Sequence, residues 1–559
     1  MPLGTDKNVR KFFAFWGGIR TRALASRSRQ DTVLPILLYG AAAVLLLFCT
    51  RNSPLFAYQD WIDPNVYMDV GRAIRNGQVL YRDVFDHKGP LIHLVLAALS
   101  AIPPLSSSMT GLYLLQCFTL SLSLHYVYRT ARRFLKPIPS AFAGVCFIAV
   151  LLQPVAYRQG GSVEELLLPF FCGGIYYLVD RFGPRFVIEA TAAFPKVPDR
   201  LAGDGEDSAT RASAFFLLGL YLGIAALTKI NLALFFAVVL VCLWFPNLRL
   251  GRYDLLGRSV ALTGAGALTA GVPAILYFAA TNSFADFFDA YIRFNLTYAG
   301  RAANVTGPST IGDTVLMALF LNIPTLLLLA CGVIFFILSR GKFLRAGRIS
   351  IGISFVVLVG LVFSSGRAYP YLFLPLVSFA GFGIVLLISR LSEILFRRRP
   401  DVLAGPRITP ARLATCAVAI LVITVVSNGT WTESKLFGTP QGGTERIASM
   451  IREDFGDREG DPNILFFNSG DIGIMGLAGA APQVRFFYAP VISYEVYPEM
   501  IDAQLGYIRD GIVDYIVLVR YTKETPYDFT DQNADYVPIA QEEQSMDATM
   551  VYITLYGKR

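Results

Sequence analysis

The chain has 559 residues, of which 54% are hydrophobic and only 16% charged, and this composition excludes a soluble globular protein of that size. Its net charge of +8 is unevenly distributed, because residues 430–559 carry 10 Lys and Arg against 20 Asp and Glu, whereas residues 1–429 carry a net +18. Basic charge spread over the loops of an apolar chain indicates membrane topology and argues against nucleic-acid binding.

The first element expected is a membrane-spanning helix over residues 33–49. Seven Lys and Arg residues precede this apolar run and no small-residue cleavage site follows it, which is typical of an uncleaved start-transfer helix. The N-terminal side is then cytoplasmic, as the positive-inside rule requires. The following loop, about residues 51–108, is expected outside.

Residues 58–93 hold an unusual density of charge for a loop that begins and ends at a bilayer. Each charged group would cost about 2.5–3.5 kcal/mol in the hydrocarbon core, so this segment is predicted to lie at the membrane surface. A helix is expected to start near Asp63, and we interpret the segment as the active-site loop. Its charged residues are Asp60, Asp63, Asp69, Arg72, Arg75, Arg82, Asp83, Asp86, His87 and Lys88.

The apolar segment 91–102 decides the topology. A helix of about 12 residues reaches about 18 Å, which is short of a hydrocarbon core of about 30 Å. If it crossed, the basic cluster at 129–136 and every later basic loop would lie outside. We therefore predict a juxtamembrane helix on the outer surface.

With that choice, about eleven spans are expected, and the basic loops between them all fall on the cytoplasmic side. The protein is then predicted to be a multi-pass protein of the cytoplasmic (inner) membrane, with a transmembrane domain over residues 1–429. The expected spans are 33–49, 109–128, 139–156, 165–182, 213–228, 231–246, 258–280, 313–338, 348–364, 369–390 and 412–428.

Residues 430–559 are predicted to form a small soluble α/β domain outside the membrane. Helical patterns at 444–454 and 497–510 alternate with apolar runs at 464–468, 484–488, 515–520 and 550–556. This alternation favours a mostly parallel sheet.

Nucleotide sugars and ATP are absent at the outer face of the membrane, which limits the substrates that an enzyme there can use. An enzyme in this place needs a lipid-linked or already exported substrate. Cations in the loop can hold a phosphate, and a carboxylate can accept the proton of an attacking hydroxyl. The seven cysteines all lie in hydrophobic runs, so neither disulfides nor a cysteine metal site is expected.

Several motifs carry a resemblance. The most specific is Phe85-Asp86-His87-Lys88-Gly89-Pro90, preceded by Asp63, Tyr67 and Tyr81-Arg82-Asp83; the others are Gly160-Gly161-Ser162-Val163-Glu164-Glu165, Leu227-Thr228-Lys229, and Gly366-Arg367 with Tyr369 and Tyr371. Together they resemble the bacterial membrane glycosyltransferases of the protein-mannosyltransferase-like (C-type, GT-C) superfamily. The matches spread over residues 30–390, and the C-terminal region adds little.

The resemblance implies a GT-C-like helical membrane fold and transfer of a sugar from a polyprenyl phosphate, with inversion, to a glycan, lipid or protein acceptor. In that superfamily a carboxylate early in the first outer loop is the catalytic base. This points to Asp63 as the base. The family commonly has a second acidic residue directly after the first, but here Pro64 follows Asp63, so Asp60 is kept as the second candidate. The candidates for phosphate binding are Lys88, His87, Arg82 and Arg367.

Each candidate has a structural alternative. Asp83 and Asp86 can pair with Arg82 and Lys88 simply to fold the loop, and Asp63 can act as a helix N-cap before Pro64. Carboxylates are also favoured at helix starts, and lysines at helix ends extend to the membrane surface. For five residues the sequence does not decide between a role in substrate binding and a role in shaping the loop. They are Asp83, Asp86, Glu164, Glu165 and Lys229.

The cofactor is left undetermined. His87 beside carboxylates can complete a divalent-metal site, but a single histidine is a weak signal. His93, on an apolar segment, is expected to be packed in the core.

Two other function classes remain open, a flippase or transporter of lipid-linked sugars and an oligosaccharide ligase or polymerase. A transporter should carry ionisable residues near the middle of its spans. Here the charge gathers at one surface, which favours the transferase.

Overall fold

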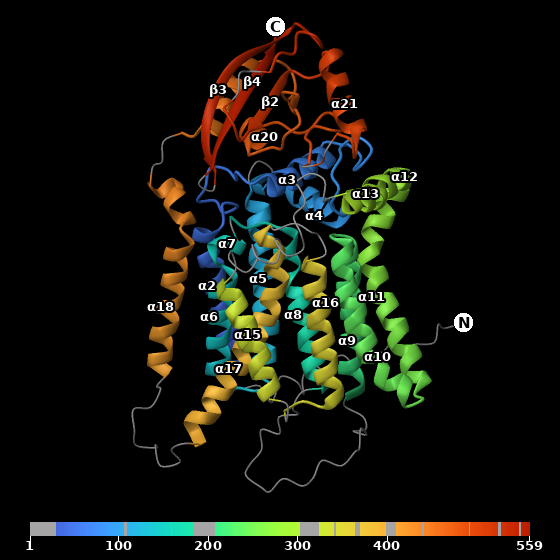
Figure 1. The fold of residues 1–559 in the computed structure, drawn as a ribbon, viewed down its shortest axis with the longest axis vertical. Helices are drawn as coiled ribbons and strands as arrows, with labels where there is room; N and C mark the ends of the chain where they lie inside the picture. Colours follow the sequence, from blue (N-terminus) through green and yellow to red (C-terminus); the bar gives the residue numbers. More distant parts are fainter. Residues whose placement is uncertain are drawn as a thin grey trace, which may run out of the picture.

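The computed structural model describes residues 29–105, 109–157, 159–182, 207–301, 323–339, 342–363, 369–397, 410–437, 441–490, 492, 494–523, 527–546 and 549–559. A bundle of helices forms one end of the molecule, and the C-terminal domain is stacked on the other end (Figure 1). Short helices of the first loop lie between the two.

Each of the expected spans overlaps a long helix of the bundle. Within the described residues, six helical segments are long and apolar enough to cross a membrane, so the count of eleven crossings stays a prediction. The bundle helices are α2 (Arg29–Cys49), α5 (Thr110–Ala131), α6 (Pro137–Leu151), α8 (Val163–Phe182), α9 (Asp207–Ala226), α10 (Ala233–Arg249), α11 (Tyr253–Ala280), α15 (Ile323–Leu338), α16 (Arg345–Phe363), α17 (Val377–Arg397) and α18 (Pro410–Asn428).

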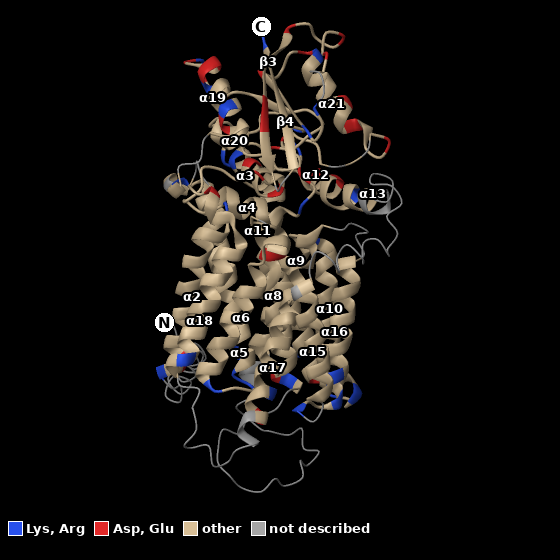
Figure 2. Ribbon diagram, turned by 60° about the vertical axis from the view of Figure 1, so that its left-hand side comes forward, with Lys and Arg blue, Asp and Glu red and all other residues tan. Residues whose placement is uncertain are grey.

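Charge is separated along the long axis of the molecule. Lys and Arg gather at the end of the bundle opposite the C-terminal domain, whereas Asp and Glu are concentrated in that domain and the adjoining loops (Figure 2). This is the distribution that the positive-inside rule requires of a cytoplasmic end and an outer end.

We predict from this that the C-terminal domain is extracytoplasmic. A reporter enzyme that is active only outside the cytoplasm should be active when fused after Arg559, and one active only in the cytoplasm should be silent. The opposite pair of results would also reject the surface placement of residues 91–102.

The segment 91–102 forms α4 (Pro90–Ser100), which packs against α3 (Ile62–Arg75) between the bundle and the C-terminal domain (Figure 1). Gly89 is its N-cap, and Pro90 occupies the first helical turn. A Cβ on Gly89 would lie 2.1 Å from the carbonyl oxygen of Leu227. Gly89 is therefore needed for the close approach that fixes this loop to the end of α9.

The C-terminal domain contains a four-stranded sheet in the order β1-β2-β4-β3. Among the described strands only β1 and β2 pair in parallel, so the expectation of a mostly parallel sheet is wrong. The apolar run 484–488 is not a strand, whereas β3 was not expected. The elements are α19 (Gly443–Phe455), β1 (Ile464–Phe466), α20 (Ile474–Leu477), α21 (Pro498–Arg509), β2 (Tyr515–Arg520), β3 (Tyr536–Met546) and β4 (Thr549–Lys558).

One hydrophobic core joins the C-terminal domain to the loop of residues 58–93. Val70 and Phe85 of the loop are fully buried in the same cluster as Met475 and Phe487 of the domain. Apolar contact of this kind excludes water from the junction. The loop that carries the candidate site residues is thus held between two folded bodies.

Candidate active site

Helix α3 carries the first candidate carboxylate near its N-terminal end. The N-cap is Trp61, which is extended at φ −82° and ψ 128°, and no side chain caps the helix. Asp63 lies inside the first turn, where the helix dipole favours a negative charge. The alternative that Asp63 is the N-cap is wrong, because the helix has already begun at Ile62.

Lys88 lies beside Asp63. Its Nζ is 3.7 Å from Asp63 Oδ1, 3.2 Å from His87 Nε2 and 5.7 Å from the centre of the Tyr67 ring. Asp63 and Tyr67 are four residues apart on α3 and share one face of the helix. The side chains of Asp63 and Lys88 remain 25% and 14% exposed, so the pair is open to a ligand.

Asp86 is a buried anchor behind this pair. It accepts hydrogen bonds from the backbone N–H of His87 at 2.7 Å and the Tyr488 hydroxyl at 2.7 Å, and Nε2 of His93 lies 3.0 Å from its Oδ2. Burial opposes ionisation of Asp86, but the contacts with His87 and His93 and the charge of Lys88 hold its pKa well below the ordinary value. Asp86 is therefore a carboxylate at neutral pH.

His87 is enclosed between Asp86 and Lys88. Its Nδ1 lies 3.2 Å from Asp86 Oδ1, and its backbone oxygen accepts a 2.6 Å hydrogen bond from Asn295. Burial and then the charge of Lys88 lower the pKa of His87. The ring is accordingly neutral at neutral pH and connects the buried carboxylate to the lysine.

Arg82 and Asp83 form a surface pair. Arg82 Nε is 3.2 Å from Asp83 Oδ1, and Arg82 also donates to the carbonyl oxygen of Thr281 at 3.2 Å. Asp83 Oδ2 accepts from the backbone of Val79 at 2.8 Å. These contacts fit the loop-folding alternative for this pair, and they do not connect Arg82 to Lys88. Arg367 lies outside the described residues.

Asp60, the second candidate for the base, is fully buried. Its Oδ2 is 2.7 Å from Nη1 of Arg51, whose other arm contacts Glu433 in the segment leading to the C-terminal domain. A buried and paired carboxylate of this kind holds the loop in place, whereas Asp63 is accessible and lies beside a cation.

Glu164 and Lys229 form a second ion pair, between α8 and the turn that precedes α10. Glu164 is 2% exposed. Among the described residues, neither its Oε2 nor the Tyr67 hydroxyl has a hydrogen-bond partner. Burial, followed by the charges of Asp63, Asp86 and Glu164, raises the pKa of Tyr67. The Glu164 pair is thus within electrostatic range of Tyr67.

Glu165 is held by a separate hydrogen-bond network. It accepts from the backbone N–H of Gly161 at 2.7 Å, from Gln116 at 3.0 Å and from the Tyr157 hydroxyl at 3.0 Å. The Ser162 hydroxyl accepts from the Glu165 backbone at 3.1 Å and caps the helix start. These contacts fit a loop-shaping role for Glu165.

Sequence reasoning named Tyr369, Tyr371 and His93 but did not predict the contacts that they and Tyr488 make with distant parts of the chain. Tyr371 stacks on Tyr369 with ring centroids 5.6 Å apart and lies 5.1 Å from the Trp61 ring, so aromatic side chains border the start of α3. Tyr488 reaches Asp86 across 402 residues. His93 is buried as expected, but it contacts Asp86. No local pattern in the sequence marks these contacts.

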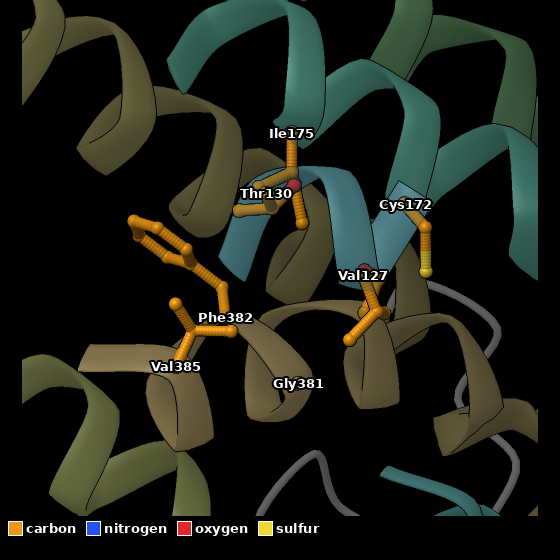
Figure 3. Close-up of a pocket in the computed structure, with 8 residues that line it drawn as sticks. Val127, Thr130, Cys172, Ile175, Gly381, Phe382 and Val385 are labelled. Atoms are coloured by element: carbon orange, nitrogen blue, oxygen red, sulfur yellow. The ribbon is translucent and has the colours of Figure 1, made fainter. Parts of the chain in front are cut away.

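A small cavity inside the bundle is separate from these charged groups. Figure 3 shows it between α5, α8 and α17, where Val127, Ile175 and Phe382 are among the lining side chains. Its lining is mainly apolar, and it contains none of the candidate residues. Within the described residues, no group of three or more His, Cys, Asp or Glu side chains is arranged to hold a metal ion.

A buried charge cluster joins α3 to the C-terminal domain. Arg72 donates a hydrogen bond to Asp69, and Asp471 accepts from the backbone N–H groups of Gly473 at 3.0 Å and Ile474 at 2.8 Å. Burial and then the charge of Asp471 raise the pKa of Asp69 well above its ordinary value, and burial also raises that of Asp471. Two interacting carboxyl groups are thus buried within the electrostatic influence of a single guanidinium, that of Arg72.

This cluster predicts a pH-dependent stability. A carboxyl whose pKa is raised in the folded state keeps a proton that the unfolded chain releases from about pH 4 upward. Unfolding therefore becomes easier as pH rises towards the folded pKa, by about 1.4 kcal/mol per pH unit for one proton. The thermal unfolding midpoints of wild type and Asp69→Asn should be measured between pH 4 and neutral pH. The midpoint of wild type should fall more steeply with rising pH than that of Asp69→Asn. Parallel curves would contradict this.

The comparisons with known proteins bear on the fold. ArnT from Cupriavidus metallidurans bound to undecaprenyl phosphate is similar over 94% of this chain and 98% of its own, with a TM-score of 0.55 and 14% identity. The apo state of the same protein aligns over 93% and 97%, with a TM-score of 0.56 and 14% identity. No protein-family model and no curated protein sequence matches the chain.

This likeness covers nearly the whole chain and shows the fold. The chain is a multi-pass membrane protein with a helical bundle and a small C-terminal domain, arranged as in ArnT. The expected helical membrane fold with a small C-terminal domain is thereby confirmed.

Proposed function

We propose that the protein is a membrane glycosyltransferase that moves a sugar from a polyprenyl phosphate to a cell-envelope glycan, lipid or protein at the outer face of the cytoplasmic membrane. The observation that carries the proposal is the accessible Asp63–Lys88 pair, with Nζ and Oδ1 3.7 Å apart. It combines one cation and one carboxylate at the junction between the bundle and the C-terminal domain. The ArnT-like fold supports the same class.

In this mechanism Lys88 receives the phosphate of the donor. The bond between the anomeric carbon and the phosphate oxygen breaks, and the electron pair leaves with the polyprenyl phosphate. An ammonium group next to that oxygen stabilises the charge that develops in the transition state. The phosphate also draws the ammonium away from Asp63 and frees the carboxylate.

Asp63 then accepts the proton of the acceptor hydroxyl, whose oxygen forms the new bond to the anomeric carbon. Attack from the face opposite the leaving phosphate inverts the configuration. The Glu164–Lys229 pair, whose carboxylate acts electrostatically on Tyr67, is a candidate for binding the sugar. The buried Oε2 of Glu164 can accept a hydrogen bond from a sugar hydroxyl.

The test is an assay of the purified full-length protein in lipid nanodiscs with a panel of polyprenyl-phosphate sugars and cell-envelope acceptors. We expect release of free polyprenyl phosphate together with a glycosylated acceptor. Mass spectrometry of envelope glycans should show one sugar missing in a deletion strain. If intact donor instead crossed the bilayer of proteoliposomes without being consumed, the transporter alternative would replace this proposal.

A further inference from the structure

A segment of the C-terminal domain runs along the turn that leads to Lys88. The backbone N–H of Phe85 donates to the carbonyl oxygen of Arg485 at 2.9 Å, and Nε of Arg485 donates to the carbonyl oxygen of Tyr81 at 3.1 Å. Three residues after Arg485, the Tyr488 hydroxyl donates to Asp86 Oδ1 at 2.7 Å. The loop and the domain are therefore connected by three directed hydrogen bonds at this point.

The segment that carries Tyr488 is itself fixed within the domain. The backbone N–H of Phe466, in β1, donates to the carbonyl oxygen of Phe487 at 2.8 Å, and that of Ala489 donates to Ser469 at 2.9 Å. Tyr488 is 3% exposed. Its hydroxyl is thus presented from a rigid support, and its position is set by the sheet of the C-terminal domain.

The contacts continue from Asp86 to the candidate site. Asp86 Oδ1 is 3.2 Å from His87 Nδ1, His87 Nε2 is 3.2 Å from Lys88 Nζ, and this Nζ is 3.7 Å from Asp63 Oδ1. Asp86 and Asp63 are therefore rival anions for one ammonium group. If other hydrogen-bond donors satisfy Asp86, the Lys88 ammonium stays beside Asp63. If they do not, the ammonium is drawn towards Asp86.

We propose that Tyr488 is a positioning residue for Lys88: its hydrogen bond satisfies Asp86 from the side of the C-terminal domain and leaves the lysine ammonium beside Asp63. The effect on catalysis rests on the proposed function, whereas the effect on the lysine does not. The C-terminal domain thereby completes the site without touching the substrate.

The Tyr488 hydroxyl is one of the hydrogen-bond donors that satisfy the buried charge of Asp86. A buried carboxylate that loses one hydrogen-bond donor is left unsatisfied, which costs free energy. A hydrogen bond to a charged group is also stronger than one between neutral groups. The lysine whose charge already stabilises ionised Asp86 is Lys88, and its Nζ contacts the far nitrogen of the His87 ring, along which it can approach Asp86. Removal of the Tyr488 hydroxyl should therefore move the ammonium from the accessible carboxylate to the buried one.

The test compares Tyr488→Phe with Tyr494→Phe in the full-length protein. Tyr494 is the matched control, because its hydroxyl also donates to a carboxylate of the same domain, Asp502 at 3.0 Å, but at an exposed position. The first measurement is the rate at which an amine-reactive reagent labels Lys88, followed by peptide mass spectrometry. Tyr488→Phe should lower that rate about tenfold, as expected for a lost hydrogen bond to a charged group, while labelling of Lys523 stays unchanged.

The second measurement is a double-mutant cycle with Asp86→Asn. If Tyr488 acts through Asp86, then Tyr488→Phe has no further effect on Lys88 labelling, or on sugar transfer, in the Asp86→Asn background. Independent, additive effects would mean that Tyr488 only packs the domain and would reject the proposal. Labelling identical to that of Tyr494→Phe would reject it as well.

The proposal can still be tested if Tyr488→Phe fails to fold. If Tyr488→Phe cannot be purified, Asp86→Asn alone should change Lys88 labelling, and unchanged labelling overturns the proposal. If the wild-type protein transfers no sugar, the proposed function fails, whereas the labelling results still decide whether Tyr488 positions the lysine.

Discussion

Asp63→Asn is expected to abolish sugar transfer while the protein stays folded. A positioned base contributes about 100- to 10,000-fold to such a reaction. The amide keeps the size of the side chain and its place in the first turn of α3, but it cannot accept a proton. Because Asp63 does not cap the helix and is 25% exposed, little stability should be lost. The measurement is the initial rate of transfer by purified enzyme, together with its thermal unfolding midpoint.

Two aspartates of the same loop serve as controls for this variant. Asp83→Asn changes an exposed carboxylate that pairs with Arg82, and its transfer rate should stay close to wild type. Asp60→Asn removes the buried partner of Arg51, so its main effect should be on stability. An Asp63→Asn enzyme within a few-fold of the wild-type rate would reject Asp63 as the base, and selective loss of rate in Asp60→Asn would identify the other carboxylate.

The second large effect is expected for Lys88→Ala. Loss of one charged donor at a developing oxyanion costs about 100- to 1,000-fold in rate, and Lys88 is the cation that contacts Asp63. The fold should persist, because the loop is still held by Gly89 N–H to Thr228 at 3.0 Å and by the buried contacts of Asp86. Single-turnover transfer from a polyprenyl-phosphate sugar measures the effect.

The control is Lys523→Ala, which removes a lysine that is 68% exposed and pairs with Glu543 at the surface of the C-terminal domain. It should leave transfer unchanged. Lys88→Arg should be intermediate, because it keeps the charge but replaces a compact ammonium with a planar fork. Near wild-type transfer by Lys88→Ala would show that the donor phosphate is held elsewhere.

Much of the architecture could be predicted from the sequence because it follows from local physical rules. Long apolar runs must form helices in a bilayer, where no other partner satisfies the backbone. The short run after Pro90 could not span, and it forms an 11-residue helix. The density of charge around Asp63 and Lys88 likewise identified the loop that carries the candidate site.

The sheet of the C-terminal domain was predicted less well. Buried strands such as β2 are recognisable as apolar runs, but β3 alternates between partly buried and exposed positions and contains two adjacent glutamates, Glu542 and Glu543. The apolar run 484–488 is equally buried, yet its backbone pairs with the loop of residues 58–93 and only in part with β1. Burial alone does not distinguish these cases.

The roles of the acidic residues were decided by the tertiary structure. The sequence ranked Asp63 before Asp60 as the base only through the family resemblance and left the role of Asp86 open, and nothing local indicates which of them faces Arg51, Lys88 or Tyr488. Those partners come from the end of α2, from the turn before α4 and from a domain about 400 residues later. A carboxylate becomes an anchor or a candidate base according to burial and neighbouring charge, and both are properties of the folded chain.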